Sequence, residues 1–179
     1  MTDIYTKGFA SGLKPDEDLA VDEWADKYRM LSAKASSLPG KWKTDTTPYL
    51  REPMQVLTNP RFQRVVLMCG AQLGKSELIA NYLGWQIDIS GGPCMIIQPT
   101  VELAKRFSKQ RIGPLLEETP RLREKVPAAR SRDSSRTMFS VEYPNGLFIL
   151  CGANSGSNLR SMPCRYVLAD EVDAYPAAV

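Results

Sequence analysis

Residues 65–77, VVLMCGAQLGKSE, decide how this chain is expected to fold. The apolar run 65–69 predicts a short strand buried on both faces, as in a parallel sheet covered by helices. The loop 70–74 follows, and then a helix is expected from about Ser76 to Ile89. A strand, a glycine-containing loop and a helix start, in that order, direct backbone N–H groups and the helix dipole at a bound phosphate. We therefore predict a phosphate-binding loop at this position.

The loop departs from the pattern G-x-x-x-x-G-K-[ST] at its first glycine. That glycine would stand at position 69, where the chain has Cys69, and Gly70 comes one residue late. The end of the pattern is intact, because Lys75 could reach the β- and γ-phosphates and the Ser76 hydroxyl could ligate magnesium. The alternative interpretation is a surface turn with a solvated lysine.

A second candidate element is the segment 166–171, YVLADE, near the end of the chain. Its apolar residues predict a buried strand, and the carboxylates of Asp170 and Glu171 follow where that strand ends. One carboxylate at a strand end can hold the magnesium water shell, and its neighbour can orient the attacking water. The alternative is a strand that runs into an acidic turn. Asp170 follows Lys75 at a spacing of 95 residues, which leaves room for strands that place the two ends side by side.

The remaining pattern alternates helices and strands, which predicts an α/β fold with a largely parallel sheet flanked by helices. Ligands in such sheets bind beyond the carboxyl ends of the strands. Pro114 is expected to kink or break the second long helix, and Asn145-Gly146 is expected to turn a hairpin. The expected elements are helices over 15–31, 49–57, 76–89 and after Thr100, strands over 64–69, 94–98, 137–143, 147–151 and 165–171, a connector over 36–48 and a loop over 152–163.

Composition excludes several classes of site. The chain of 179 residues can bury a proper core, and it has no histidine, which removes His-based triads and His metal ligation. Its four cysteines form no C-x-x-C pair and are interpreted as small buried residues in a reducing compartment. No apolar run approaches the ~20 residues of a membrane helix, and the N-terminus lacks a signal pattern. These features predict a cytoplasmic protein without a membrane partner.

Basic residues are concentrated in one part of the chain. Between Lys105 and Arg136 there are ten basic and four acidic residues, whereas the whole chain has a net charge of +3. Such a local field favours a phosphate-backbone partner, although a solvated helix face is an equal alternative. Thr100 could touch a nucleic-acid backbone or simply cap the following helix. The candidate DNA-binding residues are Thr100, Lys105, Arg106, Lys109 and Arg111.

These motifs, taken together, resemble the N-terminal ATPase part of a tailed-phage terminase large subunit of the lambda-like packaging type. The resemblance covers roughly residues 20–176 and is carried by EWADKYRMLS, GKWKTDTTPYLREPM, GAQLGKSE, QPTVELAKRFSKQRI, ARSRDSS, GANSG and RYVLADEVDAYP. It implies a P-loop ATPase of the additional-strand, catalytic-glutamate type that uses ATP and Mg²⁺. The implied role is to drive double-stranded DNA into a procapsid in the bacterial host cytoplasm. The implied partners are the terminase small subunit, the procapsid portal and further copies of the same chain during packaging.

The resemblance also implies roles for single residues. Terminase loops tolerate a deviant first glycine, so that Cys69 would end the strand and Gly70 would begin the loop. Some terminases carry an arginine in the loop, but Ala71 or Gln72 occupies that place here. The implied ATP-binding residues are Gly70, Ala71, Gln72, Leu73, Gly74, Lys75 and Ser76, with Gln55 for adenine or as a plain helix-surface residue. Lys75 and Glu171 are implied as catalytic and Ser76 and Asp170 as magnesium-associated, and the candidate arginine fingers are Arg160, Arg132 and Arg106.

The length of the chain sets the expected domain organisation. We expect an N-terminal helical and connector segment over 1–60 and a P-loop ATPase core over 61–179. Terminase large subunits continue into a coupling motif and a metal-dependent nuclease domain that cuts concatemeric DNA, and we expect neither here. Three alternatives remain: a superfamily-two-like helicase or translocase, a catalytically idle ATP- and DNA-binding fragment, and a structural module in which both motifs are coincidences.

Overall fold

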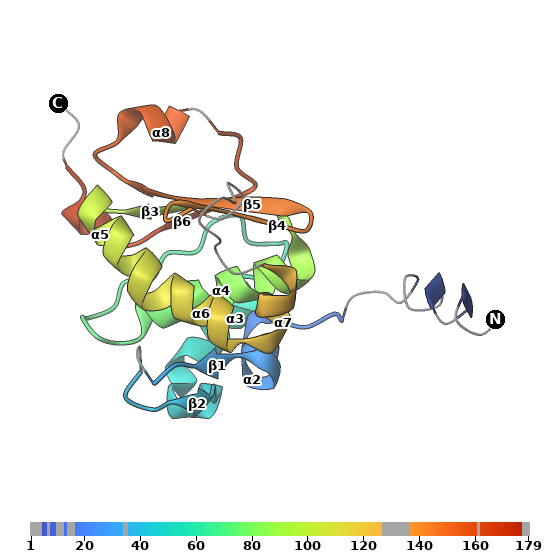
Figure 1. Ribbon diagram of the computed structural model, residues 1–179. Helices are drawn as coiled ribbons and strands as arrows, with labels where there is room; N and C mark the ends of the chain where they lie inside the picture. The colour runs from blue at the N-terminus through green and yellow to red at the C-terminus, as the bar shows by residue number, and fades with distance from the viewer. Residues whose placement is uncertain are drawn as a thin grey trace.

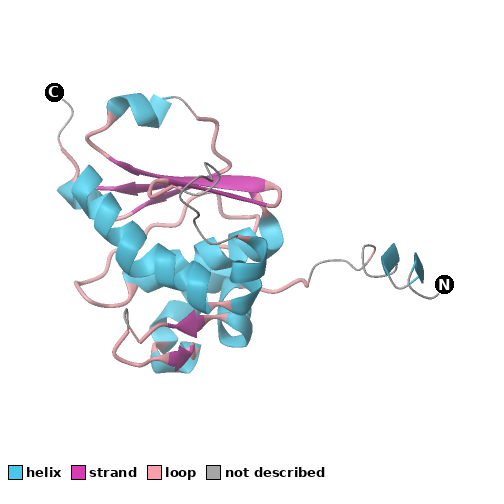
Figure 2. Cartoon of the chain, in the orientation of Figure 1, coloured by secondary structure: helices cyan, strands magenta, loops and turns pink. Residues whose placement is uncertain are grey.

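A four-stranded mixed sheet forms the centre of the computed structural model, which describes residues 17–33, 36–126, 137–160 and 162–176 and residues 5, 6, 8, 9 and 13. The strand order is β4-β5-β3-β6. β3 pairs in parallel with β5 and β6, and β4 pairs antiparallel with β5, as Figure 2 shows with the strands in magenta. The strands are β3 (Gly92–Gln98), β4 (Ser140–Tyr143), β5 (Gly146–Gly152) and β6 (Tyr166–Ala169). The expected α/β class and largely parallel sheet are confirmed.

Helices pack against one face of the sheet, and the segment that carries α8 lies on the other side (Figure 1). A small hairpin, β1 (Met30–Leu31) with β2 (Gly40–Lys41), lies beyond the helices. The α-helices are α2 (Val21–Tyr28), α3 (Arg51–Val56), α4 (Lys75–Trp85), α5 (Val101–Phe107), α6 (Gly113–Glu118), α7 (Pro120–Lys125) and α8 (Gly156–Arg160). Wider π-helical turns span Gln86–Ser90 and Ser108–Ile112, and 3₁₀ turns span Thr44–Thr46, Pro48–Leu50 and Val172–Ala174.

The core joins the N-terminal helix to the helix that follows the loop. Trp24 of α2 is completely buried, and a Cβ added at Gly84 of α4 would stand 2.2 Å from its ring. Only glycine leaves room for the indole at this crossing, so α2 and α4 pack closely. The indole N–H donates to Asp88 Oδ2 at 2.8 Å, and Arg121 and Lys125 of α7 pair with the same buried carboxylate at 2.8 and 2.9 Å. These contacts satisfy a buried charge and tie three helices together.

The predicted strand over 64–69 is wrong. These residues have no regular secondary structure, and Val66 and Met68 are 72% and 95% exposed. Their apolar composition is typical of a buried strand, but a strand also needs a neighbour for its backbone N–H and C=O groups. Within the described chain no strand pairs with this segment. For the same reason Cys69 is exposed, whereas Cys94 and Cys151 are buried as expected.

Other elements differ in extent. The first helix begins at Val21, residues 17–20 have no regular secondary structure, and positions 15 and 16 lie outside the described residues. The predicted loop 152–163 contains α8, and residues 137–139 precede β4 instead of belonging to it. Pro114 stands in the first turn of α6, directly after a π-helical turn that interrupts the α-helical pattern as expected. Asn145, with φ of 64°, makes the predicted turn between β4 and β5.

No described helix is long and apolar enough to cross a membrane.

Candidate functional site

The loop before α4 has the backbone expected of a phosphate-binding turn. Gln72 and Gly74 both lie in the left-handed region, with φ of 60° and 82°. A Cβ at Gly74 would stand 3.0 Å from Leu50 Cδ1, so this position favours glycine for both conformation and space. α4 then begins at Lys75, and no side chain caps its start. The first N–H groups of the helix are therefore open to an anion.

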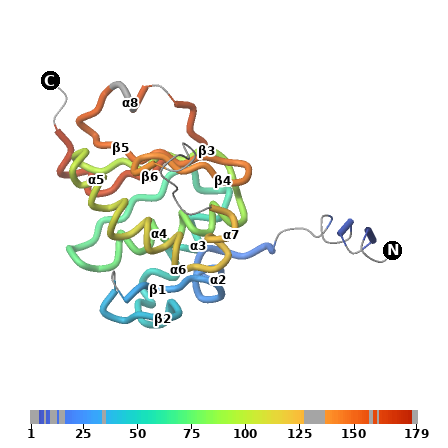
Figure 3. The backbone as a smooth tube through the Cα atoms, in the orientation of Figure 1, coloured from blue at the N-terminus to red at the C-terminus, as the bar shows by residue number. Residues whose placement is uncertain are grey.

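The direction of α4 is fixed by its contacts with the sheet. Tyr82 packs edge-on against Tyr166, the first residue of β6, with ring centroids 5.9 Å apart. Ser90 is at the end of the π-helical turn, and its Oγ forms a hydrogen bond of 2.8 Å with the Tyr166 hydroxyl. The last turns of this helix therefore lie at the amino end of the sheet, and α4 begins away from that end (Figure 3). That direction is the one in which a helix N-terminus faces ligands bound at strand carboxyl ends.

The acidic pair follows β6 directly. Asp170 is only 6% exposed, and its N–H donates to the Ile97 carbonyl at 3.0 Å. Its Oδ2 accepts a hydrogen bond of 3.1 Å from the buried Gln98 amide at the end of β3. Glu171 has φ of 50°, a strained value for this residue type, and its side chain is exposed. At this strand end the Asp170 carboxylate is therefore oriented by a hydrogen bond, and the Glu171 carboxylate is exposed to solvent.

Tyr175 closes the other side of this strand end. Its hydroxyl donates to the Ile97 carbonyl at 2.9 Å. Burial, together with the negative charge of Asp170, raises the pKa of Tyr175 to about 12. The phenol is thus a neutral donor at physiological pH, and it fixes the turn that carries Glu171.

A hollow of about 340 Å³ opens beside the phosphate loop. Most of the side chains that line it are apolar, and Lys75 brings a positive charge to its edge. Such a space suits a flat, largely apolar ring attached to a charged group. The lining residues are Tyr49, Leu50, Pro53, Leu67, Cys69, Leu73 and Lys75.

Gln55, proposed for adenine, does not line this hollow. Its amide donates to Asp22 Oδ2 at 2.9 Å, and Arg51 approaches the same carboxylate oxygen at 3.5 Å. Gln55 therefore helps to satisfy a buried acid between α2 and α3. Its role with a base stays a prediction.

The candidate DNA-binding residues and the candidate arginine fingers lie in different environments. Thr100 Oγ1 accepts the Leu103 N–H at 3.2 Å, so Thr100 is the N-cap of α5. Arg111 is half-buried and donates to Glu77 Oε1 at 2.6 Å. Lys105, Arg106 and Lys109 are exposed on α5 and the turn after it, and Arg160 is exposed on α8. Arg132 lies outside the described residues.

The described residues bring together no group of three or more Cys, Asp or Glu side chains that could hold a metal. A magnesium site of the nucleotide type needs only one or two protein oxygens, which act with waters and substrate phosphates. Asp170 and Ser76 supply oxygen donors of the kind that Mg²⁺ prefers.

Sequence reasoning missed Gln98, Glu77 and Arg29. Gln98 is the polar last residue of an otherwise apolar strand, a position that marks the ligand edge of a parallel sheet and could have been flagged. Arg29 is buried and donates to the Glu77 carbonyl at 3.0 Å. No local pattern shows that contact, because 48 residues separate the partners.

Comparison with known proteins adds independent information. The family model described as phage terminase large subunit gpA, ATPase domain, matches residues 36–179. The terminase large subunit of Enterobacteria phage P21 is 23% identical over 158 residues, which cover 88% of this chain and 24% of that protein. The terminase large subunit of Escherichia phage lambda is 24% identical over 169 residues, which cover 94% of this chain and 26% of that protein. The chain thus spans about a quarter of the length of these relatives. No solved structure matches it significantly.

Proposed function

We propose that this chain, which belongs to the family of phage terminase large subunit gpA ATPase domains, binds and hydrolyses Mg-ATP. The nucleotide would lie between the loop 70–76 and the Asp170–Glu171 strand end. The observation that carries the proposal is the left-handed Gly74 followed by the uncapped start of α4. This arrangement offers backbone N–H groups and a positive helix end to phosphates. The fold would then be a P-loop NTPase of the additional-strand, catalytic-glutamate type. The division into 1–60 and 61–179 stays a prediction.

The roles of single residues follow from their chemistry. The Lys75 ammonium would lie against the β- and γ-phosphates and stabilise negative charge as the terminal phosphoryl leaves. Ser76 and Asp170 would hold Mg²⁺, which neutralises phosphate charge when bound. Glu171, exposed beside Asp170, would orient a water in line with the γ-phosphate and accept its proton. Gln98 and Tyr175 keep this strand end in place.

The apolar hollow is the candidate site for the base. It begins at Lys75, and a nucleotide whose phosphates lie on the loop would extend its ring system toward Tyr49 and Leu73. An aromatic ring and aliphatic side chains offer stacking and apolar contact to a purine.

The exposed basic residues support a nucleic-acid partner. Lys105, Arg106 and Lys109 would bind the backbone of double-stranded DNA. A full-length relative would use the ATPase to package viral DNA into a procapsid, with the terminase small subunit and the portal as partners in the host cytoplasm. Arg106 and Arg160 are the described candidates for an arginine that reaches a nucleotide, from this copy or a neighbouring one. No observation favours strand separation over movement along duplex DNA.

The test is ATP binding and phosphate release with duplex DNA present. Lys75→Ala should abolish nucleotide binding, because it removes the charge at the phosphates. Glu171→Gln should preserve binding and stop hydrolysis. Unchanged turnover in Glu171→Gln would remove Glu171 from its role, and tight binding without turnover by the wild-type chain would indicate an idle ATP- and DNA-binding fragment.

A further inference from the structure

Glu77, the third residue of α4, occupies a position from which a carboxylate can cover the helix start. A glutamate at this position often folds back and accepts the N–H of the N-cap residue. The same chain shows this in α2, where Glu23 is also the third residue and accepts the Ala20 N–H at 2.9 Å. In α4 the corresponding contact is not made. Gly74, the N-cap of α4, is left-handed, whereas Ala20 is extended, and the Glu77 carboxylate has other partners.

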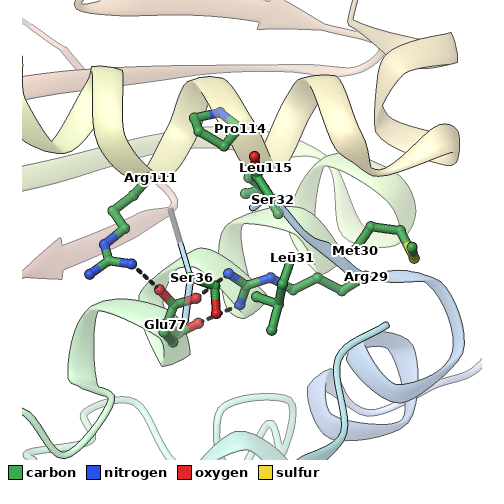
Figure 4. Close-up of a pocket in the computed structure, with 9 residues that line it drawn as sticks. All are labelled: Arg29, Met30, Leu31, Ser32, Ser36, Glu77, Arg111, Pro114 and Leu115. Carbon is green, nitrogen blue, oxygen red and sulfur yellow. Dashed lines mark hydrogen bonds and ion pairs between the residues drawn. The ribbon is translucent and has the colours of Figure 1, made fainter. Parts of the chain in front are cut away.

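Two arginines from different elements hold the Glu77 carboxylate (Figure 4). Arg29, at the end of α2, donates to Glu77 Oε2 and to its backbone carbonyl, the latter at 3.0 Å. Arg111, in the turn between α5 and α6, donates to Oε1 at 2.6 Å. Both carboxylate oxygens are thus engaged, and both guanidinium groups are directed at them in the close-up.

The three groups differ in exposure. The side chains of Arg29, Glu77 and Arg111 are 5%, 20% and 37% exposed. Arg29 also donates to Asn81 and lies over the Trp42 ring at 5.0 Å, so it is part of the core. Burial lowers the pKa of Arg29, and the charge of Glu77 opposes this shift. Arg111 is the partner that can be replaced without opening the core.

We propose that Arg29 and Arg111 are positioning residues that keep the Glu77 carboxylate off the N-terminus of α4, so that nucleotide phosphates can occupy it. The inference rests on the proposed function, since it concerns the same loop. Without Arg111, the carboxylate regains one free oxygen and its negative charge lies one turn or less from the phosphate site. It then competes with the nucleotide for the same N–H groups and repels its phosphates.

The experiment measures ATP affinity by calorimetry in the presence of Mg²⁺ and the absence of DNA. Arg111→Gln should raise the Kd by about three- to tenfold, the range expected for a partly exposed charge near a helix end. Arg111→Lys, which keeps a cation beside Glu77, should bind more tightly than Arg111→Gln. The decisive variant is Arg111→Gln combined with Glu77→Gln, which removes the competing charge and should recover most of the lost affinity. Arg123→Gln, an equal charge change at an exposed residue of α7, is the control.

Each outcome is assignable when thermal unfolding is recorded for every variant. Recovery of affinity in the double variant supports a restraint on Glu77, because a merely structural ion pair would leave the double variant as weak as Arg111→Gln. Equal ATP affinity in Arg111→Gln and wild type, or no recovery in the double variant, overturns the inference and leaves the ATP site intact. Absence of ATP binding by the wild-type chain overturns the proposed function as well.

Discussion

Gln98 and Asp170, which are 72 residues apart in the chain, meet at the carboxyl edge of the sheet through a buried hydrogen bond of 3.1 Å. The contact follows from the parallel pairing of β3 and β6, in which Ile97 lies opposite Ala169. Gln98 directly follows Ile97 in the chain, and Asp170 directly follows Ala169. The bond engages Oδ2 of Asp170 and so orients the carboxylate.

Gln98→Ala should weaken metal binding at the nucleotide site. Partners that orient a ligating carboxylate typically contribute about tenfold or more to metal affinity. We expect the Kd of Mn²⁺ for the ATP complex, measured by electron paramagnetic resonance, to rise about tenfold. Gln110→Ala, at an exposed residue of the turn after α5, is the control. An unchanged Mn²⁺ affinity in Gln98→Ala would mean that Asp170 does not need this donor.

Cys69 should be the most reactive thiol and should be protected by ATP. It is exposed and lines the hollow beside Lys75. Burial raises the pKa of Cys94 to about 12 and also raises the pKa values of Cys151 and Cys164. At pH 8 these three thiols therefore contain less of the reactive thiolate than an unperturbed cysteine would. Labelling with a thiol reagent followed by mass spectrometry should show Cys69 reacting first, and more slowly with saturating Mg-ATP. A labelling rate at Cys69 that ATP does not change would place the nucleotide elsewhere.

Duplex DNA affinity should depend on salt through the exposed basic residues after Thr100. Replacing Lys105, Arg106 or Lys109 by Gln should weaken binding. It should also make the negative slope of log K against log salt shallower, by about 0.9 for each phosphate that the variant no longer neutralises. Fluorescence anisotropy with a labelled duplex measures both quantities. Lys41→Gln, on β2, is the matched control. Equal slopes for all four variants and the wild type would exclude this surface as the DNA site.

Gly84→Ala should destabilise the fold even though alanine is the better helix former. The new methyl group would stand 2.2 Å from the Trp24 ring, and the completely buried indole is held by Asp88. Overpacking of this kind costs about 1–3 kcal/mol of unfolding free energy. Urea denaturation measures it, with Gly156→Ala as the control, because a Cβ there meets nothing within 4 Å. Equal stability of the two variants would show that α2 can move away from α4.

The predicted strands that pair with a neighbouring strand are present in the structure. The predicted strand over 64–69, which has no neighbouring strand to pair with, is not. The apolar runs in β3, β5 and β6 and the run over 65–69 look alike, because composition reports a tendency to be buried. Which strand pairs with which depends on distant segments, and that information is not local. The helix at Lys75 and the turn at Asn145 are predictable, since glycine, asparagine and helix periodicity act within a few residues.

The candidate site is predictable residue by residue but not as a set of contacts. Motif and strand-end position lead to the candidates Lys75, Ser76, Asp170 and Glu171, whose roles stay predictions. The partners around them, Gln98 for Asp170 and two arginines for Glu77, arise only from the packing of separate elements. The sequence groups one of these arginines, Arg111, with the DNA-binding candidates because it lies among other basic residues, and the structure adds its ion pair with Glu77.

A crystal structure with Mg²⁺ and a non-hydrolysable ATP analogue tests most directly whether one triphosphate joins the two ends of the site. We expect the γ-phosphate to lie within hydrogen-bond reach of the Lys75 Nζ, with the Asp170 carboxylate about 5 Å away through the magnesium water shell. An analogue bound with Asp170 more than about 15 Å from its γ-phosphate, beyond the span of a magnesium–triphosphate unit, would contradict it.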